Sequence, residues 1–208
     1  MKSLPCFQNR SFIVVGVGNP GVKYASHRHN AGFMTVDSLA EELGGIWSLS
    51  KHDALTCSTI YSGNELFLVK PQTYMNLSGK AVQKIVSFKK SDMVPLIVIH
   101  DELDIKFGRV RIKIGGGDGG HRGVRSITDS IRFRDFTRVR IGIGRPPAGV
   151  DPEEFVLRSF TPPERPVARR LVQLAAEATK LIVCYGTEHA KSIIHSREND
   201  FSNHDFSE

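Results

Sequence analysis

The sequence predicts an α/β fold, a single α/β/α sandwich domain around a central mixed, largely parallel sheet. Two observations support this. Short β-branched apolar runs alternate with longer segments whose apolar residues recur at helical spacing, as in successive strand–helix–strand units. The 208 residues contain no repeat or linker and fit one domain with a substantial core. We therefore expect one domain over 1–195 and a polar, flexible tail over 196–208.

The expected strands are short apolar runs bounded by turn residues. The second and third of them flank Ser62-Gly63-Asn64, which is a hairpin signal. The last two alternate charged and apolar residues, so each is expected to carry one basic face. The six runs are 11–17, 54–61, 65–70, 95–99, 107–114 and 137–143.

The expected helices are the segments with apolar residues at helical spacing. Asn30 is expected to cap the first of them, and Gly44-Gly45 ends it. The fourth is the longest and has one continuous apolar side. The four segments are 30–43, 77–88, 123–133 and 163–184.

Composition excludes several classes of protein. Apolar residues make up 40% of the chain, which argues against a wholly disordered protein. No run approaches the roughly 20 apolar residues of a membrane helix, and the first ten residues lack a secretory signal core. Cys6, Cys57 and Cys184 lack metal-ligand spacing and are expected to be thiols in a reducing cytosol. These features predict a cytoplasmic protein without a membrane partner.

The positive charge is concentrated in one fifth of the chain. The net charge is +6, yet the segment 104–145 alone holds eleven Lys and Arg against four Asp and Glu, a balance of +7. A solvated basic face without a partner is one explanation. We favour a footprint for a polyanion, with nucleic acid first, because the segment also contains a Gly-rich loop.

One histidine and one aspartate stand out at the ends of predicted strands. His29 closes a loop that leaves the first strand, and Asp101 follows the strand over 95–99. A histidine of ordinary pKa near 6.5 can act as a general base at neutral pH. A carboxylate on its other nitrogen would fix the tautomer and stabilise the imidazolium. A lone histidine is more often structural, but this pairing favours a role in hydrolysis.

Two asparagines could supply neutral amides to the same cleft. Asn19 lies in Gly16-Val17-Gly18-Asn19-Pro20-Gly21, which formally matches a dinucleotide fingerprint. We reject that match because no helix starts on its third glycine, and Asp37 falls within a helix rather than at a strand end. Asn76 could be a helix N-cap, or its amide could hold a water or a substrate carbonyl. No nucleophilic serine or cysteine arrangement is visible, and the histidines lack metal-ligand spacing, so we expect metal-free water activation without a cofactor.

The block over 115–123 is the most specific segment, with five glycines in six residues before His121-Arg122-Gly123. Glycines allow close backbone approach, and a following helix would offer N–H groups to an anion. We expect an anion site here, with His121 as a wall or substrate contact rather than a second base.

In this order and spacing, these segments resemble bacterial-type peptidyl-tRNA hydrolases from about residue 12 to 190. The resemblance implies an α/β/α domain that cleaves the ester joining a peptide to tRNA and so recycles tRNA released prematurely in translation. The basic strand over 138–144 also fits this family. The matching segments are 14–21, Arg28-His29-Asn30, 70–79, 100–104 and the Gly-rich block.

The resemblance also implies roles for individual residues and a monomeric enzyme. His29 would be the catalytic base and Asp101 would orient it, while Asn19 and Asn76 would bind the peptide and position water or the carbonyl. The residues expected to line the cleft are Tyr24, Met75 and His121. The residues expected to bind the tRNA end and its phosphates are Lys113 and Arg140. The chain departs from the family at Arg122, where the family usually has Asn; Arg122 would grip a phosphate or weaken turnover.

Two rival functions remain at this point. A non-catalytic RNA-binding protein on the same fold would not need His29, Asp101 and both asparagines, although Arg122 leans toward it. An esterase for small acyl esters would not need the basic segment. Peptidyl-tRNA as the nucleic-acid substrate accounts for both observations.

Overall fold

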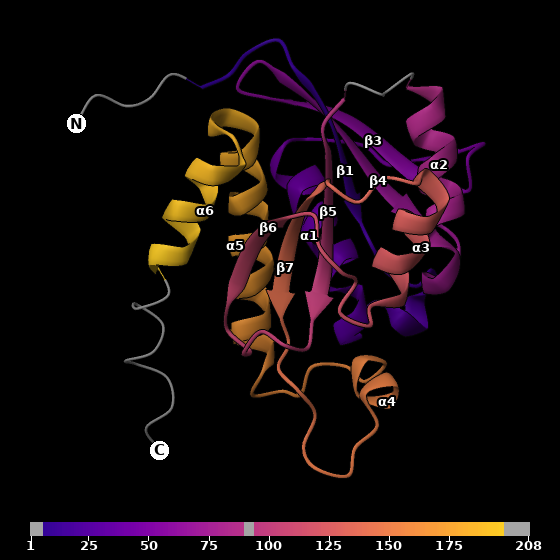
Figure 1. Cartoon of the computed structure of the whole chain (residues 1–208), viewed down its shortest axis with the longest axis vertical. Helices are drawn as coiled ribbons and strands as arrows, with labels where there is room; N and C mark the ends of the chain where they lie inside the picture. Colours follow the sequence, from indigo (N-terminus) through magenta and orange to yellow (C-terminus); the bar gives the residue numbers. More distant parts are fainter. Residues whose placement is uncertain (1–5, 90–93, 198–208) are drawn as a thin grey trace.

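The computed structural model describes residues 6–89 and 94–197, which form a seven-stranded sheet between layers of helices (Figure 1). The strands are β1 (Ser11–Gly16), β2 (Ser48–Ser50), β3 (Ala54–Tyr61), β4 (Asn64–Pro71), β5 (Leu96–Glu102), β6 (Val110–Ile114) and β7 (Thr137–Gly142). Their order is β2-β3-β4-β1-β5-β7-β6. The central strands β4, β1, β5 and β7 are parallel, whereas β2, β3 and β6 pair antiparallel. The predicted α/β class with a mixed sheet is confirmed.

The helices cover both faces of the sheet. On one face lie α1 (Ala31–Glu42) and α5 (Arg165–Tyr185), and on the other lie α2 (Ser78–Phe88) and α3 (Arg122–Ile131). Helix α6 (Thr187–Ser196) packs beside α5 and β6. Within the described part of the chain, no helix is long and apolar enough to cross a membrane.

Side-chain alternation along the strands explains the two-sided core. On β1, Phe12 and Val14 belong to the cluster under α1 and α5, and Ile13 and Val15 belong to the cluster under α2 and α3. Successive side chains of a strand point to opposite faces, so a strand buried on both faces is apolar throughout. This is why the run over 11–17 contains no polar position after Ser11.

One strand and two α-helices are absent from the sequence-based prediction. Strand β2 has only three residues. Helix α6 follows α5 after one residue, Gly186, whose φ is +83°. The third is α4 (Pro152–Val156), which Asp151 caps by accepting the Glu153 N–H at 2.6 Å. Its Asp-Pro start was a visible helix signal. Of the predicted tail, Ser196 ends α6, and residues 198–208 lie outside the described residues.

The prediction for the cysteines is wrong for two of the three. Cys6 and Cys184 form a disulfide, whereas Cys57 is a buried free thiol. The disulfide joins positions 178 residues apart in sequence. The Phe7 N–H donates to the carbonyl of Cys184 at 2.8 Å, which places the N-terminal segment against the end of α5. Such a long-range pairing leaves no spacing signal in the sequence.

Candidate active site

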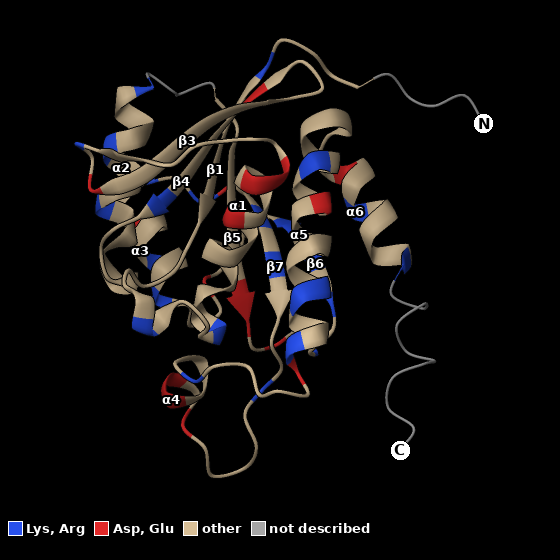
Figure 2. Cartoon of the chain, turned by 180° about the vertical axis from the view of Figure 1, so that it is seen from behind, with Lys and Arg blue, Asp and Glu red and all other residues tan. Residues whose placement is uncertain are grey.

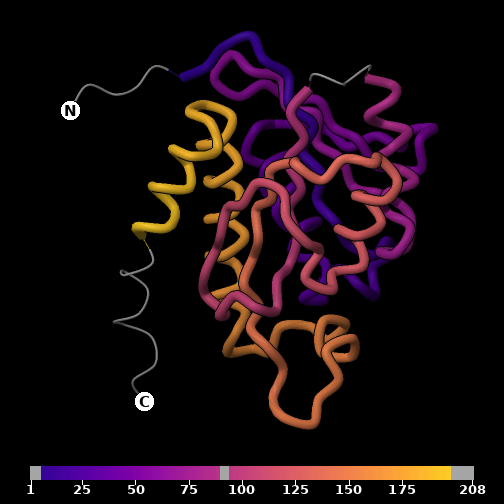
Figure 3. Tube along the Cα trace, viewed as in Figure 1, coloured from indigo at the N-terminus to yellow at the C-terminus, as the bar shows by residue number. Residues whose placement is uncertain are grey.

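A cavity of about 730 Å³ lies where the central parallel strands end. This volume is in the range of small-ligand sites. One wall comes from the segments that follow β1 and β4, the floor from the end of β5, and the opposite wall from the Gly-rich loop and α4. Figure 3 traces the long excursion of the chain between β7 and α5 that carries α4. Among the residues lining the cavity are Asn19, Tyr24, His29, Met75, Asn76, Asp101, His121, Arg122 and Glu153.

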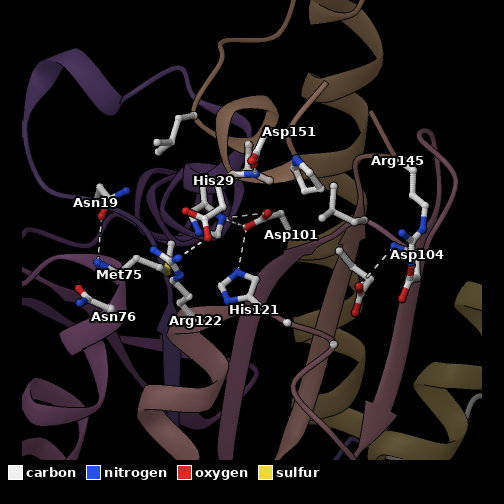
Figure 4. A pocket seen from close by; sticks show the side chains of 18 of the residues that line it. Asn19, His29, Met75, Asn76, Asp101, Asp104, His121, Arg122, Arg145 and Asp151 are labelled. Atoms are coloured by element: carbon white, nitrogen blue, oxygen red, sulfur yellow. Dashed lines mark hydrogen bonds and ion pairs between the residues drawn. The ribbon is translucent and has the colours of Figure 1, made fainter. Parts of the chain in front are cut away.

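His29 and Asp101 meet at the floor of the cavity (Figure 4). His29 lies in the 3₁₀ turn η2 (Arg28–Asn30), and its Nδ1 is 2.9 Å and 3.0 Å from the two carboxylate oxygens of Asp101. Strand β5 extends to Glu102, beyond the predicted end at residue 99, so Asp101 is held by the sheet itself. Since the ionised carboxylate only accepts hydrogen bonds, His29 Nδ1 carries the proton and Nε2 is the basic nitrogen.

The two groups shift each other's pKa. Burial lowers the pKa of His29, but the charge of Asp101 and its hydrogen bond outweigh burial and raise this pKa above its ordinary value. Burial would raise the pKa of Asp101, yet His29 and His121 together lower it well below its ordinary value. Asp101 is therefore an ionised, 2% exposed acceptor for two imidazoles.

His121 is tied into the site more firmly than a wall residue. Its Nε2 donates to Asp101 Oδ1 at 3.0 Å, and its Nδ1 accepts the N–H groups of Gly123 at 3.1 Å and Val124 at 3.3 Å. It thereby caps the N-terminus of α3. The predicted anion site is wrong for these two N–H groups, because the His121 ring already occupies them.

His29, Asp101 and His121 form the one cluster with metal-ligand spacing in the described residues, with one ligand atom each within 4.8 Å of the others. The hydrogen bonds do not suit a metal. His121 Nδ1 accepts two N–H groups, so its single proton is on Nε2. A metal at Nε2 would have to displace that proton and leave an imidazolate. The donor set fits a shared carboxylate better than a metal ion.

Asn19 and Asn76 lie on one wall of the cavity (Figure 4). The Oδ1 of Asn19 accepts the Met75 N–H at 2.9 Å, which leaves its NH₂ group as the donor on offer. Asn30 occupies the N-cap position of α1, as predicted, but its side chain makes no capping hydrogen bond and instead bonds the main-chain N–H and C=O of Asn19, each at 2.9 Å. Asn76 is exposed in η3 (Met75–Leu77) and does not cap α2, whose N-cap is Leu77.

Arg122 forms an ion pair with Glu153 of α4, and both residues line the cavity. Both side chains are more than half exposed, at 59% and 64%, so the pair is expected to contribute at most about 1 kcal/mol. The charge of Arg122 acts to lower the pKa of His29, after the larger effects of burial and Asp101. The structure thus gives Arg122 a carboxylate partner. Glu153 was missed in the sequence because it belongs to no catalytic or binding motif, although the Asp151-Pro152 start of α4 is a helix signal.

Lys113 and Arg140 lie outside the cavity on adjacent strands. Lys113 is exposed on β6, and Arg140 on β7 approaches Glu102 at 3.8 Å. Figure 2 shows Lys and Arg along β7 and the first half of α5, with acidic residues at the end of β5 and on α4. Neither cation lines the cavity, but Arg140 lies next to Glu102, which does.

The predicted basic face of β7 is wrong at Arg138, which is only 2% exposed. Its guanidinium donates to the carbonyls of Gly115, Gly116 and Gly117, the last at 2.7 Å. Gly115 and Gly116 have φ of +63° and +89°, which glycine adopts without strain. Arg138 thus holds the Gly-rich loop in place, a role that charge alternation cannot reveal.

Comparisons with known proteins agree with one another. A family model described as peptidyl-tRNA hydrolase matches residues 13–202. The peptidyl-tRNA hydrolase of Mycobacterium tuberculosis (strain ATCC 25618 / H37Rv) is 46% identical over 185 residues, 88% of this chain and 97% of that protein. That of Frankia casuarinae is 47% identical over 185 residues, 89% and 94% of the two chains. The crystal structure of peptidyl-tRNA hydrolase from Acinetobacter baumannii has a TM-score of 0.82 at 34% identity and covers 90% of this chain and 96% of its own.

The fold and the cavity define a class, an α/β protein with an imidazole–carboxylate pair and neutral amides around a cleft, which is equipment for general-base hydrolysis. The chain belongs to the peptidyl-tRNA hydrolase family, whose model spans most of its length. Membership favours a catalytic function over RNA binding alone.

Proposed function

We propose that the cavity hydrolyses the ester bond between a peptide, or an N-blocked amino acid, and tRNA, with His29 as the general base. The observation that carries this proposal is the contact of His29 Nδ1 with Asp101 at 2.9 Å, which leaves Nε2 as the basic nitrogen of a ring that lines the cavity. Family membership supplies the substrate class.

The proposed reaction needs only water and the side chains present. Nε2 of His29 removes a proton from water while the water oxygen attacks the ester carbonyl carbon. Asp101 stabilises the imidazolium that forms. The tetrahedral intermediate collapses, the bond to the ribose oxygen breaks, and the imidazolium returns its proton to that oxygen. Asn19 and Asn76 offer neutral N–H donors to the developing oxyanion. Tyr24, Met75 and His121 border the peptide.

The oligomeric state, the cellular location and the contacts with tRNA are part of the same proposal. We propose that the enzyme acts as a monomer, as the family resemblance implies. Because the proposed substrate is a product of translation, we propose that the enzyme acts in the cytoplasm. The basic residues beside the cavity, Lys113 and Arg140, bind phosphates of the tRNA end.

The decisive experiment measures release of free tRNA from N-acetyl-aminoacyl-tRNA, with and without a chelator. We expect chelator-resistant release, because no step requires a metal. Tight binding of tRNA without cleavage would contradict the proposal and favour the non-catalytic alternative. Chelator-sensitive release would contradict the metal-free mechanism.

Replacing Lys113 or Arg140 with alanine is expected to weaken tRNA binding. Each lost phosphate contact should also reduce the slope of log K against log salt concentration by about one unit. Binding of labelled tRNA measured from low to moderate salt checks this. Lys84→Ala is a matched control, since Lys84 lies on α2 and pairs with Asp53. Parent-like slopes in both test variants would contradict the phosphate contacts.

Replacing Arg122 with asparagine is expected to move the acid limb of the pH–rate profile to higher pH. The groups that face His29 are Asp101, His121, Arg122 and His27. Loss of the Arg122 cation removes an effect that lowers the pKa of His29, so the base is protonated over a wider range. The profile of kcat/KM checks this, and a limb that moves to lower pH would contradict it.

A further inference from the structure

Arg28, the residue before His29, is a buried cation whose two terminal nitrogens both donate hydrogen bonds, while its Nε has no partner. It is 4% exposed. Nη1 donates to the carbonyls of Arg158 at 3.1 Å and Ser159 at 2.8 Å, and Nη2 donates to the carboxylate of Glu164 at 2.6 Å. Burying a charge is unfavourable unless it is paired and hydrogen-bonded, so these contacts must offset the cost of removing the Arg28 guanidinium from water.

Two aromatic rings and the backbone add to the contact between Arg28 and the segment over 155–160. The guanidinium carbon lies 4.4 Å from the ring centroid of Phe155 and 5.2 Å from that of Phe160. The Arg28 N–H donates to the Arg158 carbonyl at 3.1 Å, and His27 forms an antiparallel bridge with Ser159. The turn that carries His29 is therefore joined to the segment between α4 and α5 by both side chain and backbone.

That segment also forms a wall of the cavity. Val156 and Leu157, which line the cavity, directly follow Phe155, which lies against the Arg28 guanidinium. Among the described residues, Arg28 itself does not line the cavity, so it does not reach the substrate. It joins the η2 turn, which bears the proposed base, to the segment that follows α4.

We infer that Arg28 is a positioning residue, which clamps the 155–159 segment to the η2 turn and so fixes His29 against Asp101. This inference rests on the proposed role of His29. A planar guanidinium fork can hold two carbonyls, a carboxylate and two rings at once, which an ammonium cannot. Misplacement of a catalytic group by about 1 Å can cost a factor of about 100 in rate.

The test compares Arg28→Lys, Arg28→Met and Glu164→Gln with the parent on N-acetyl-aminoacyl-tRNA. The control is Lys180→Met, which also removes a cation paired with a carboxylate and close to an aromatic ring, but away from the cavity. We expect kcat to fall about 10- to 100-fold in both Arg28 variants and less in Glu164→Gln. Lys180→Met should keep the parental kcat at matched folded fraction.

A second readout separates positioning from mere stability. The charged and titratable groups around His29 are Asp101 on β5, His121 and Arg122 at the start of α3, and His27. If the contact with Asp101 loosens, the raised pKa of His29 falls, so the acid limb of kcat/KM moves to lower pH. The pKa of His29 measured by NMR titration of its ring, with the signals assigned by comparison with His29→Ala, should also fall.

The inference would be overturned if folded Arg28 variants kept the parental kcat, the parental acid limb and the parental pKa of His29. This holds whatever the melting temperatures of these variants. If the Arg28 variants do not fold, Glu164→Gln decides, and a parental titration and acid limb there would overturn it. The titration needs no turnover. Absence of hydrolysis by the parent would therefore defeat the proposed function, while the titration would still test the position of His29.

Discussion

Replacing His29 with alanine is expected to lower kcat/KM by about 10²- to 10⁴-fold, the usual contribution of a general base. In the proposed mechanism the His29 imidazole takes the proton from water, since its Nδ1 is bonded to Asp101 and its Nε2 is basic. His121 cannot replace it, because its Nδ1 already accepts two backbone N–H groups. The measurement is steady-state hydrolysis of N-acetyl-aminoacyl-tRNA.

The control for this variant is His189→Ala, which removes an imidazole on α6 that does not belong to the cavity. It should hydrolyse the substrate at the parental rate. Binding of tRNA should also persist in His29→Ala, since Lys113 and Arg140 are intact. Parental turnover in a folded His29→Ala enzyme would show that another group is the base.

Replacing Asp101 with asparagine is expected to have an effect of the same order, about 10²- to 10⁴-fold on kcat. Two N–H groups, from His29 Nδ1 and His121 Nε2, converge on the carboxylate. Both carboxylate oxygens lie within 3.0 Å of His29 Nδ1, so the NH₂ group of an asparagine would face His29 in either orientation of the amide. A His29 ring that faces NH₂ must put its proton on Nε2, where it can no longer accept one from water.

This prediction is checked by the pH dependence as well as by the rate. The pKa of His29 is raised by Asp101, so it should fall in Asp101→Asn, and the acid limb should move to lower pH. Asp129→Asn, on the exposed side of α3, is the matched control and should behave as the parent. A fast Asp101→Asn enzyme with an unmoved limb would remove Asp101 from the mechanism.

Much of the fold could be predicted from local patterns. Strand β3 spans the predicted 54–61, and β1, β4, β7, α1 and α2 begin and end within two residues of their predicted bounds. These elements depend on alternation, helical spacing and turn glycines, which act between near neighbours. The ends of β5 and β6 were less accurate, because their length depends on pairing with β7.

By itself the sequence determined which chemistry is available: His29, Asp101, Asn19 and Asn76 at segment ends, a basic segment and a Gly-rich block, with the resemblance supplying the substrate class. Only the tertiary structure decided how these groups are connected. His29 and Asp101 are 72 residues apart, Arg28 and Glu164 are 136 apart, and the two bonded cysteines are 178 apart. Spacing along the chain cannot encode such contacts, because they arise when parallel strands align their ends and distant segments pack against them.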